Sequence, residues 1–203
     1  MGADVGETTG GRTRWRVFGL VLLVGVFGVG LMFTGLSQGA IAASFAVAGT
    51  SYKASADRLD AQGVVQYGSV DRSADQAHPV LVNGFRKAKL DNFCQSIVVP
   101  GLPAVGDITV KIAAPGGMSA DNLVLGIEEV TGDITLNNVE IGRDAGTMDK
   151  GPNGAIGDAG TFGIQADSTQ ITGLRQVAWS TTASTLKLNQ VQIKASVGRD
   201  ECF

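Results

Sequence analysis

An uncharged apolar run, Val17–Leu36, constrains this chain most. It holds twenty residues without a charge or a proline, and about 20 apolar residues suffice for a helix to span the hydrocarbon core of a bilayer. Arg12, Arg14 and Arg16 directly precede the run. The positive-inside rule therefore predicts a cytoplasmic N-terminus and an exported chain from Ser44 onward.

Two interpretations of the N-terminal segment stay open. A basic start, an apolar stretch and the small residues ending at Ala42 or Ala43 are typical of a cleaved signal peptide. The run is longer than the roughly 7–15 residues of an ordinary signal peptide, which favours an uncleaved signal anchor. Both interpretations predict a signal segment over 1–42 and an exported domain over 43–203, secreted or membrane-anchored.

The composition of the exported part excludes several partners. Residues 1–42 carry three Arg, one Asp and one Glu, net +1, so the chain's net charge of −3 becomes −4 for residues 43–203. A mildly acidic domain without a basic cluster argues against nucleic acid as a partner. Its 161 residues (203 − 42) match the size of a single domain.

Alternating apolar residues predict a mainly β fold. Ile108, Val110 and Ile112 alternate with polar residues, which is the signature of a half-buried strand. Shorter patterns predict strands over 52–59 and 63–70, and no helical period is sustained after Ala43. We expect a single domain of long antiparallel strands, curved or rolled around an apolar face, after an N-terminal hydrophobic helix.

Two strands break their two-residue period. The apolar positions step by three from Leu136 to Val139 and again from Leu188 to Val191. Such a step predicts a β-bulge or a local twist, here at residues 137–138 and 189–190. We interpret the two segments as a degenerate repeat of long hairpins.

A glycine-rich stretch, residues 142–163, separates these two segments. It contains seven glycines and few apolar residues. This composition is typical of a long loop, and we expect it to be mobile.

The cysteines, Cys94 and Cys202, both lie in the exported part. An even number of cysteines in an oxidising compartment favours a disulfide, with two buried thiols as the alternative. The bridge would enclose 107 residues (202 − 94 − 1) and stabilise the fold by about 4–5 kcal/mol on chain-entropy grounds. Two cysteines and one histidine are too few for a soft metal site, so we predict neither a metal nor a cofactor.

No set of residues predicts catalysis. The sequence Gly35–Gly39 fits the G-x-S-x-G motif of hydrolases, but Ser37 then belongs to the export segment and no strand precedes it. His78 is the single histidine, and its place before Pro79 predicts a solvated turn. We therefore assign no catalytic residues.

The aromatic residues suggest either a core or a ligand site. Packing in the interior is one role, and lining an elongated lipid groove is the other, because curved sheets of long strands can leave an apolar cavity. The candidate groove residues are Phe45, Phe85, Phe93, Phe162 and Trp179.

Several blocks of the chain resemble a known family. They are Gln38–Phe45, Tyr67–Ser69, Leu90–Ser96, Gln176–Trp179 and Glu201–Phe203. The sequence is similar there to secreted actinobacterial proteins of unknown function whose members are often labelled cholesterol esterase. The resemblance implies a secreted or cell-envelope location and transfers no catalytic residue.

These observations predict an exported cell-envelope protein, non-enzymatic, that binds membrane lipid or a membrane protein through a β-rich domain. A secreted esterase acting on sterol or acyl esters is the alternative. A structural or assembly subunit of the envelope is the third hypothesis.

Overall fold

The computed structural model describes Trp15 and residues 18–19, 22–23, 49–72 and 76–203. The described residues before position 24 are helical, and most of the predicted export segment, including Ser37, lies outside the described part. Within that part, no helix is both long and apolar enough to cross a membrane. The fold below belongs to the unit that begins at Ala43.

The described residues form nine strands in one antiparallel sheet, which confirms the mainly β prediction. The elements are β1 (Tyr52–Arg72), β2 (Ala77–Asp91), β3 (Phe93–Leu102), β4 (Gly106–Ala114), β5 (Met118–Asn137), β6 (Glu140–Asp144), the 3-10 turn η1 (Ala145–Thr147), β7 (Phe162–Thr182), β8 (Thr185–Leu188) and β9 (Gln192–Val197). The two strands predicted over 52–59 and 63–70 are one strand. Gly63 joins them in the left-handed region, at φ 65°.

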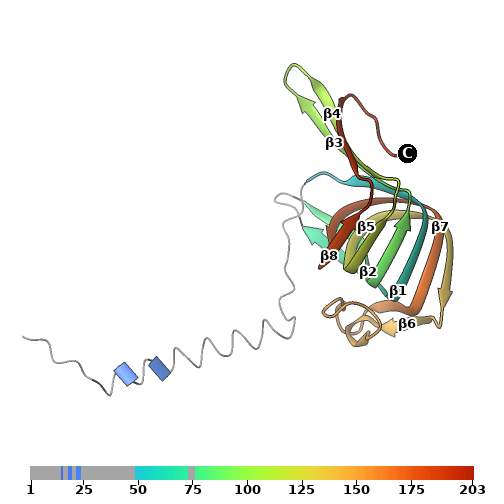
Figure 1. Ribbon diagram of the computed structural model, residues 1–203. Helices are drawn as coiled ribbons and strands as arrows, with labels where there is room; N and C mark the ends of the chain where they lie inside the picture. The colour runs from blue at the N-terminus through green and yellow to red at the C-terminus, as the bar shows by residue number, and fades with distance from the viewer. Residues whose placement is uncertain (1–14, 16–17, 20–21, 24–48, 73–75) are drawn as a thin grey trace, which may run out of the picture. The chain divides into compact units, whose positions relative to one another are not determined.

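Strands β1, β2, β5 and β7 close into a ring (Figure 1). β1 pairs with β2 on one side and β7 on the other, while β5 pairs with both β2 and β7. Inward side chains from all four strands fill the interior, among them Leu59, Phe85, Leu123 and Leu174. Because the ring is closed, each of its four strands is paired with two neighbours of the ring.

Strands β3, β4 and β9 form an arm that extends beyond the ring (Figure 1). β3 pairs with the first residues of β1, Tyr52 to Ser55, and then with β4. β4 pairs in turn with β9, which ends the sheet. We call these three strands the arm.

Left-handed residues mark three strand boundaries. Asn92 (φ 51°) separates β2 from β3, Asn138 (φ 51°) separates β5 from β6, and Gln190 (φ 55°) lies between β8 and β9. Both positions predicted to be irregular thus coincide with strand boundaries. The register against β7 does not shift between Asn137 and Glu140, so the first of them is not a β-bulge. Asparagine tolerates this conformation better than most residues, which explains its place at positions 92 and 138 but not the glutamine at 190.

The glycine-rich stretch packs against the ring, which the expectation of a long mobile loop did not include. Ala145, Met148 and Ala155 bury themselves against Val65 on the outer face of β1. A Cβ at Gly151 would overlap the Val65 side chain. The glycine content therefore permits close backbone approach to the sheet and is not a sign of disorder.

Candidate functional site

The arm presents a surface of branched apolar side chains that the described residues leave uncovered. Strand register aligns Val99 with Ile108 and Val197 in one row across β3, β4 and β9. Directly paired residues of neighbouring strands share one face of a sheet. The apolar arm face consists of Ile97, Val99, Ile108, Val110, Ile112, Ile193, Ala195 and Val197.

The apolar arm face is most exposed on β9. Ile193 is 68% exposed and Val197 is 72% exposed, and Val99 is exposed as well. At the base of the arm, Ile97 packs against the core of the ring. The core thus continues outward onto an open surface, and contiguous exposed apolar patches of this kind mark interaction sites.

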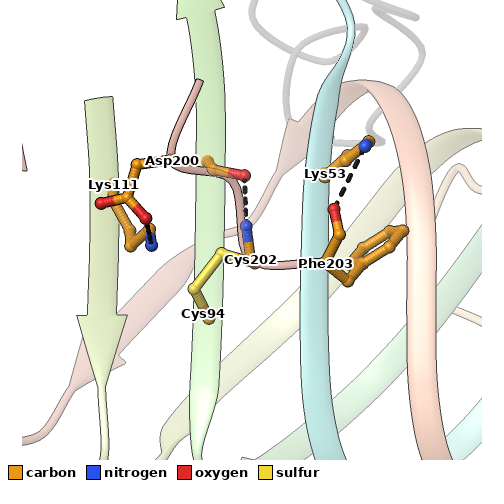
Figure 2. Close-up of a disulfide and its surroundings, with 7 residues drawn as sticks. Lys53, Cys94, Lys111, Asp200, Cys202 and Phe203 are labelled. Atoms are coloured by element: carbon orange, nitrogen blue, oxygen red, sulfur yellow. Dashed lines mark hydrogen bonds and ion pairs between the residues drawn. A yellow bond between two sulfur atoms is a disulfide. The ribbon is translucent and has the colours of Figure 1, made fainter. Parts of the chain in front are cut away.

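The opposite face of the arm is polar and covered by the C-terminal segment (Figure 2). A disulfide joins Cys94 of β3 to Cys202, with their Cα atoms 5.9 Å apart. The backbone N–H of Cys202 donates to the Ser96 hydroxyl at 3.1 Å. Lys53 donates to the Phe203 carbonyl oxygen at 3.2 Å, which ties the end of the chain to β1.

Buried hydroxyls and an ion pair complete this attachment. Thr109 is fully buried, and its hydroxyl donates to the Gly198 carbonyl at 2.6 Å and accepts from the Asp200 N–H at 3.1 Å. Lys111 Nζ lies 2.5 Å from an Asp200 carboxylate oxygen. The lysine holds the pKa of Asp200 below its ordinary value because it donates to the charged form.

The aromatic residues proposed to line one groove are not brought together. Phe85 and Phe93 are buried in the ring core, whereas Phe162 is 61% exposed. Trp179 stacks on His78 with ring centroids 3.7 Å apart. Phe45 lies outside the described residues.

The interior of the ring is nearly filled. A cavity of about 110 Å³ lies between Phe85, Ile127 and Ile171. Pockets for drug-sized ligands span roughly 300–1,000 Å³, so this cavity is too small to enclose a sterol or an acyl chain.

His78 is not a solvated turn residue, so that prediction is wrong. It belongs to β2, opposite Asp71 of β1, and its Nε2 is buried without a partner among the described residues. The Ser180 hydroxyl donates to Asp71 at 2.6 Å. No described serine is hydrogen-bonded to His78 Nε2.

Tyr52 lies beside Ser180, the residue that donates to Asp71. Its hydroxyl hydrogen-bonds Thr181 and donates to the Ser180 carbonyl at 3.2 Å. Burial raises the pKa of Tyr52 to about 12, so the phenol stays neutral at physiological pH.

The sequence shows the alternation in residues 108–112 that contributes to the apolar arm face, but it does not show that this face is exposed. Alternation shows that one side of a strand is apolar without showing what covers that side. Only the register shows that Ile193 and Val197 extend the same surface, since β9 is distant in sequence from β4.

Comparisons with known proteins identify the chain by family alone. Neither the curated proteins nor the solved structures contain a match. A family model, described as a family of unknown function, DUF6230, matches residues 48–203, which span the ring, the arm and the C-terminal segment. The chain therefore belongs to the DUF6230 family.

Proposed function

We propose that this protein is an exported, non-enzymatic cell-envelope protein that contacts membrane lipid through the apolar arm face. The observation that carries the proposal is that apolar side chains are aligned across the strands of the arm and that two of them, Ile193 and Val197, are more than two-thirds exposed. Export itself rests on the apolar run over 17–36 and the arginines before it.

The position of the arm in the chain favours lipid as the occupant. β1 begins at Tyr52, and Tyr52 pairs with Ile97 at the base of the arm. Fifteen residues, 37–51, separate this point from the apolar run. Extended, they reach about 50 Å at most, so an anchored chain keeps the arm within reach of the bilayer surface.

The energetics of the exposed side chains also favour lipid contact. Burying a valine or isoleucine contributes about 1.5–3 kcal/mol. Ile193 and Val197 alone therefore offer about 3–6 kcal/mol before the cost of ordering. The face carries no charged residue that would have to be desolvated.

The test places a photoreactive benzoyl-phenylalanine in the full chain, reconstituted in phosphatidylcholine vesicles. Position 193 or 197 reports the apolar arm face, and position 192 reports the opposite side of the same strand. We expect lipid adducts, detected by mass spectrometry, to be about tenfold more abundant at 193 and 197, because alternate residues of a strand face opposite ways.

Matched variants sharpen this test. Ile193→Lys should suppress the lipid adduct at position 197, whereas Gln192→Lys, which adds the same charge on the other side, should leave it unchanged. Equal lipid labelling at 192 and 197, or none at 197, would refute lipid contact by this face.

A specific observation favours a second candidate, a self-assembling envelope subunit. β9 ends the sheet, so one side of its backbone is open to pairing with another strand. In the same experiment, adducts between two copies of the chain at 193 and 197, in place of lipid adducts, would support assembly.

A further inference from the structure

A polar hollow lies on the outer face of the ring, away from the apolar arm face. Two rows of side chains run across β2, β1, β7 and β5 in direct register. The first row is Lys89, Asp60, Gln170 and Thr135, and the second is Lys87, Gln62, Ser168 and Asn137. Ala61 and Ala88 lie between the rows, and because their side chains belong to the ring core, their backbone forms the floor of the hollow.

The hollow has the size of a small-molecule site. Its volume is about 630 Å³, and a second hollow of about 500 Å³ adjoins it and shares Gln62 and Lys87. Asp149 and Lys150 of the glycine-rich stretch form the wall of the second hollow. Sites for small ligands commonly span roughly 300–1,000 Å³.

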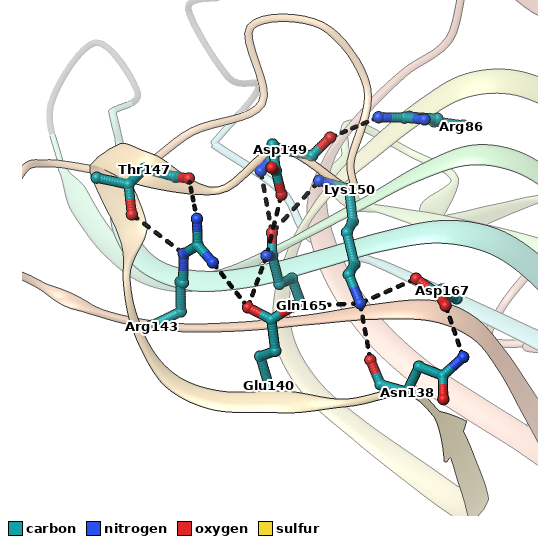
Figure 3. A network of polar contacts seen from close by, with 9 residues as sticks. All are labelled: Arg86, Asn138, Glu140, Arg143, Thr147, Asp149, Lys150, Gln165 and Asp167. Atoms are coloured by element: carbon teal, nitrogen blue, oxygen red, sulfur yellow. Dashed lines mark hydrogen bonds and ion pairs between the residues drawn. The ribbon is translucent and has the colours of Figure 1, made fainter.

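A network of polar contacts fixes the wall that the glycine-rich stretch supplies (Figure 3). Gln165 is fully buried, and its Oε1 accepts from the N–H groups of Asp149 and Lys150 at 3.0 and 3.3 Å. Arg86 donates to the Gly151 carbonyl at 2.8 Å. Sequence reasoning missed Gln165, because a glutamine in an alternating strand has no distinguishing pattern.

The charged residues around the hollow differ in whether they form an ion pair. Asp60 is held by Arg58 at 2.7 Å, and Asp167 is held by Lys150 at 2.9 Å. Lys87 and Lys89, by contrast, form no ion pair with any described residue. In register, Lys87 lies opposite Asp121 of β5 and Lys89 lies opposite Asp60 of β1, but neither lysine closes an ion pair with its carboxylate. The two ammonium groups of β2, a strand paired on both sides, thus stay available to an anion.

We propose that this hollow binds an anionic, polyhydroxylated group, such as a phosphorylated sugar or polyol. Lys87 and Lys89 bind the anion, since charge-assisted hydrogen bonds are the strong ones. Gln62, Gln170 and Ser168 offer amide and hydroxyl groups to the neighbouring ligand hydroxyls. Both lysines project from one strand into the same space, so one ligand contacts both.

The test uses calorimetry on the full chain in a nonionic detergent, with glucose 6-phosphate as the probe. Glucose and inorganic phosphate serve as partial probes. We expect glucose 6-phosphate to bind at least about tenfold more tightly than either, because it alone engages the cations and the polar rows together. Raising the salt concentration should weaken binding, since exposed charges are screened.

Lys87→Gln with Lys89→Gln should weaken binding about tenfold or more. Lys187→Gln is the matched control, because Lys187 is an exposed lysine of β8 without an ion pair among the described residues. It should bind as the unsubstituted chain does. Circular dichroism of each variant checks that the sheet is retained.

A lipid headgroup and a soluble sugar phosphate share this chemistry, and a second measurement separates them. The chain is reconstituted in nanodiscs of phosphatidylcholine with phosphatidylinositol, and retained lipid is read by native mass spectrometry. Selective retention of phosphatidylinositol, lost in the double variant, assigns the site to a headgroup. Binding of glucose 6-phosphate alone assigns it to a soluble ligand.

Either result supports the anion site. Neither form binding, or equal binding by the double variant and the unsubstituted chain, overturns it. The outcome is independent of the lipid adducts at 193 and 197, which report the apolar arm face.

Discussion

The two faces of the arm are built from the same three strands and differ in what covers them. One face carries Ser96, Thr109 and Lys111, and the C-terminal segment binds all three through a disulfide-linked chain end. The other face carries branched apolar side chains and stays open. Solvent thus meets the apolar side of the arm, whereas Ser96 and Thr109 on the polar side are buried beneath the C-terminal segment, which is the reverse of an ordinary sheet on a core.

This contrast teaches that the covered polar face stabilises the arm while the apolar face is available for binding. Removing a contact between the polar face and the C-terminal segment should therefore lower stability. Those on the apolar arm face should change lipid contact alone. The free energy of unfolding of the full chain in detergent, measured with denaturant, tests this division.

The largest effect should come from the disulfide. Replacing Cys94 and Cys202 by serine removes a bridge between residues 108 positions apart. We expect the free energy of unfolding to fall by about 4 kcal/mol, because the unfolded chain regains entropy. Reduction of the unsubstituted chain should produce the same loss, and an unchanged unfolding midpoint would contradict the role of the covered face.

A buried hydroxyl should give the next effect. Thr109→Val preserves shape but removes the contacts to Gly198 and Asp200, and we expect a loss of about 1–2 kcal/mol. Ser196→Ala is the matched control. Ser196 pairs with Thr109 on the same face, and its buried hydroxyl has no partner among the described residues. The control should be neutral or slightly stabilising, and an equal loss in both variants would contradict a specific role for Thr109.

The Lys111–Asp200 pair should give a smaller, pH-dependent effect. Because the folded-state pKa of Asp200 lies below its ordinary value of 3.8, its stabilising contribution is present above that pH. It is lost as the pH falls through the lower folded-state value. Asp200→Asn should remove this dependence, so the difference in Tm between the two chains should vanish at low pH. A constant difference from neutral pH down to pH 2 would contradict this assignment.

The apolar arm face should show the smallest effect on stability. Val197→Thr keeps the branched shape at a position that is 72% exposed, and we expect a change within about 0.5 kcal/mol. Its lipid adduct yield at position 193 should nevertheless fall. A loss above 1 kcal/mol, on the order of a core substitution, would show that the face packs against another part of the protein.

Local patterns alone predicted much of the fold. The alternation in residues 108–112 and the three-residue steps at 136–139 and 188–191 predicted strands and their interruptions. Both features depend on neighbouring residues, because side chains of a strand alternate with a period of two. The sequence therefore determined the class of fold and the positions of two strand boundaries.

Other features depended on contacts that no local pattern specifies. The closure of β1 on both β2 and β7 and the attachment of residues 142–163 to Val65 were not predicted. Glycine-rich composition signals a loop whether it is free or packed, so it did not predict this attachment. Likewise, the described aromatic residues of the proposed groove do not form one site, because Phe85 and Phe93 are buried in the ring core whereas Phe162 is exposed.

The sequence by itself determined a mainly β domain with two cysteines and an apolar N-terminal run. The tertiary structure alone decided which apolar side chains of the arm remain exposed and which lysines form no ion pair among the described residues. The physical reason is that burial and ion pairing are properties of pairs of segments. Strand register aligns Val99, Ile108 and Val197 in one row and places Lys87 beside Gln62. The residues next to them in the sequence do not predict these neighbours.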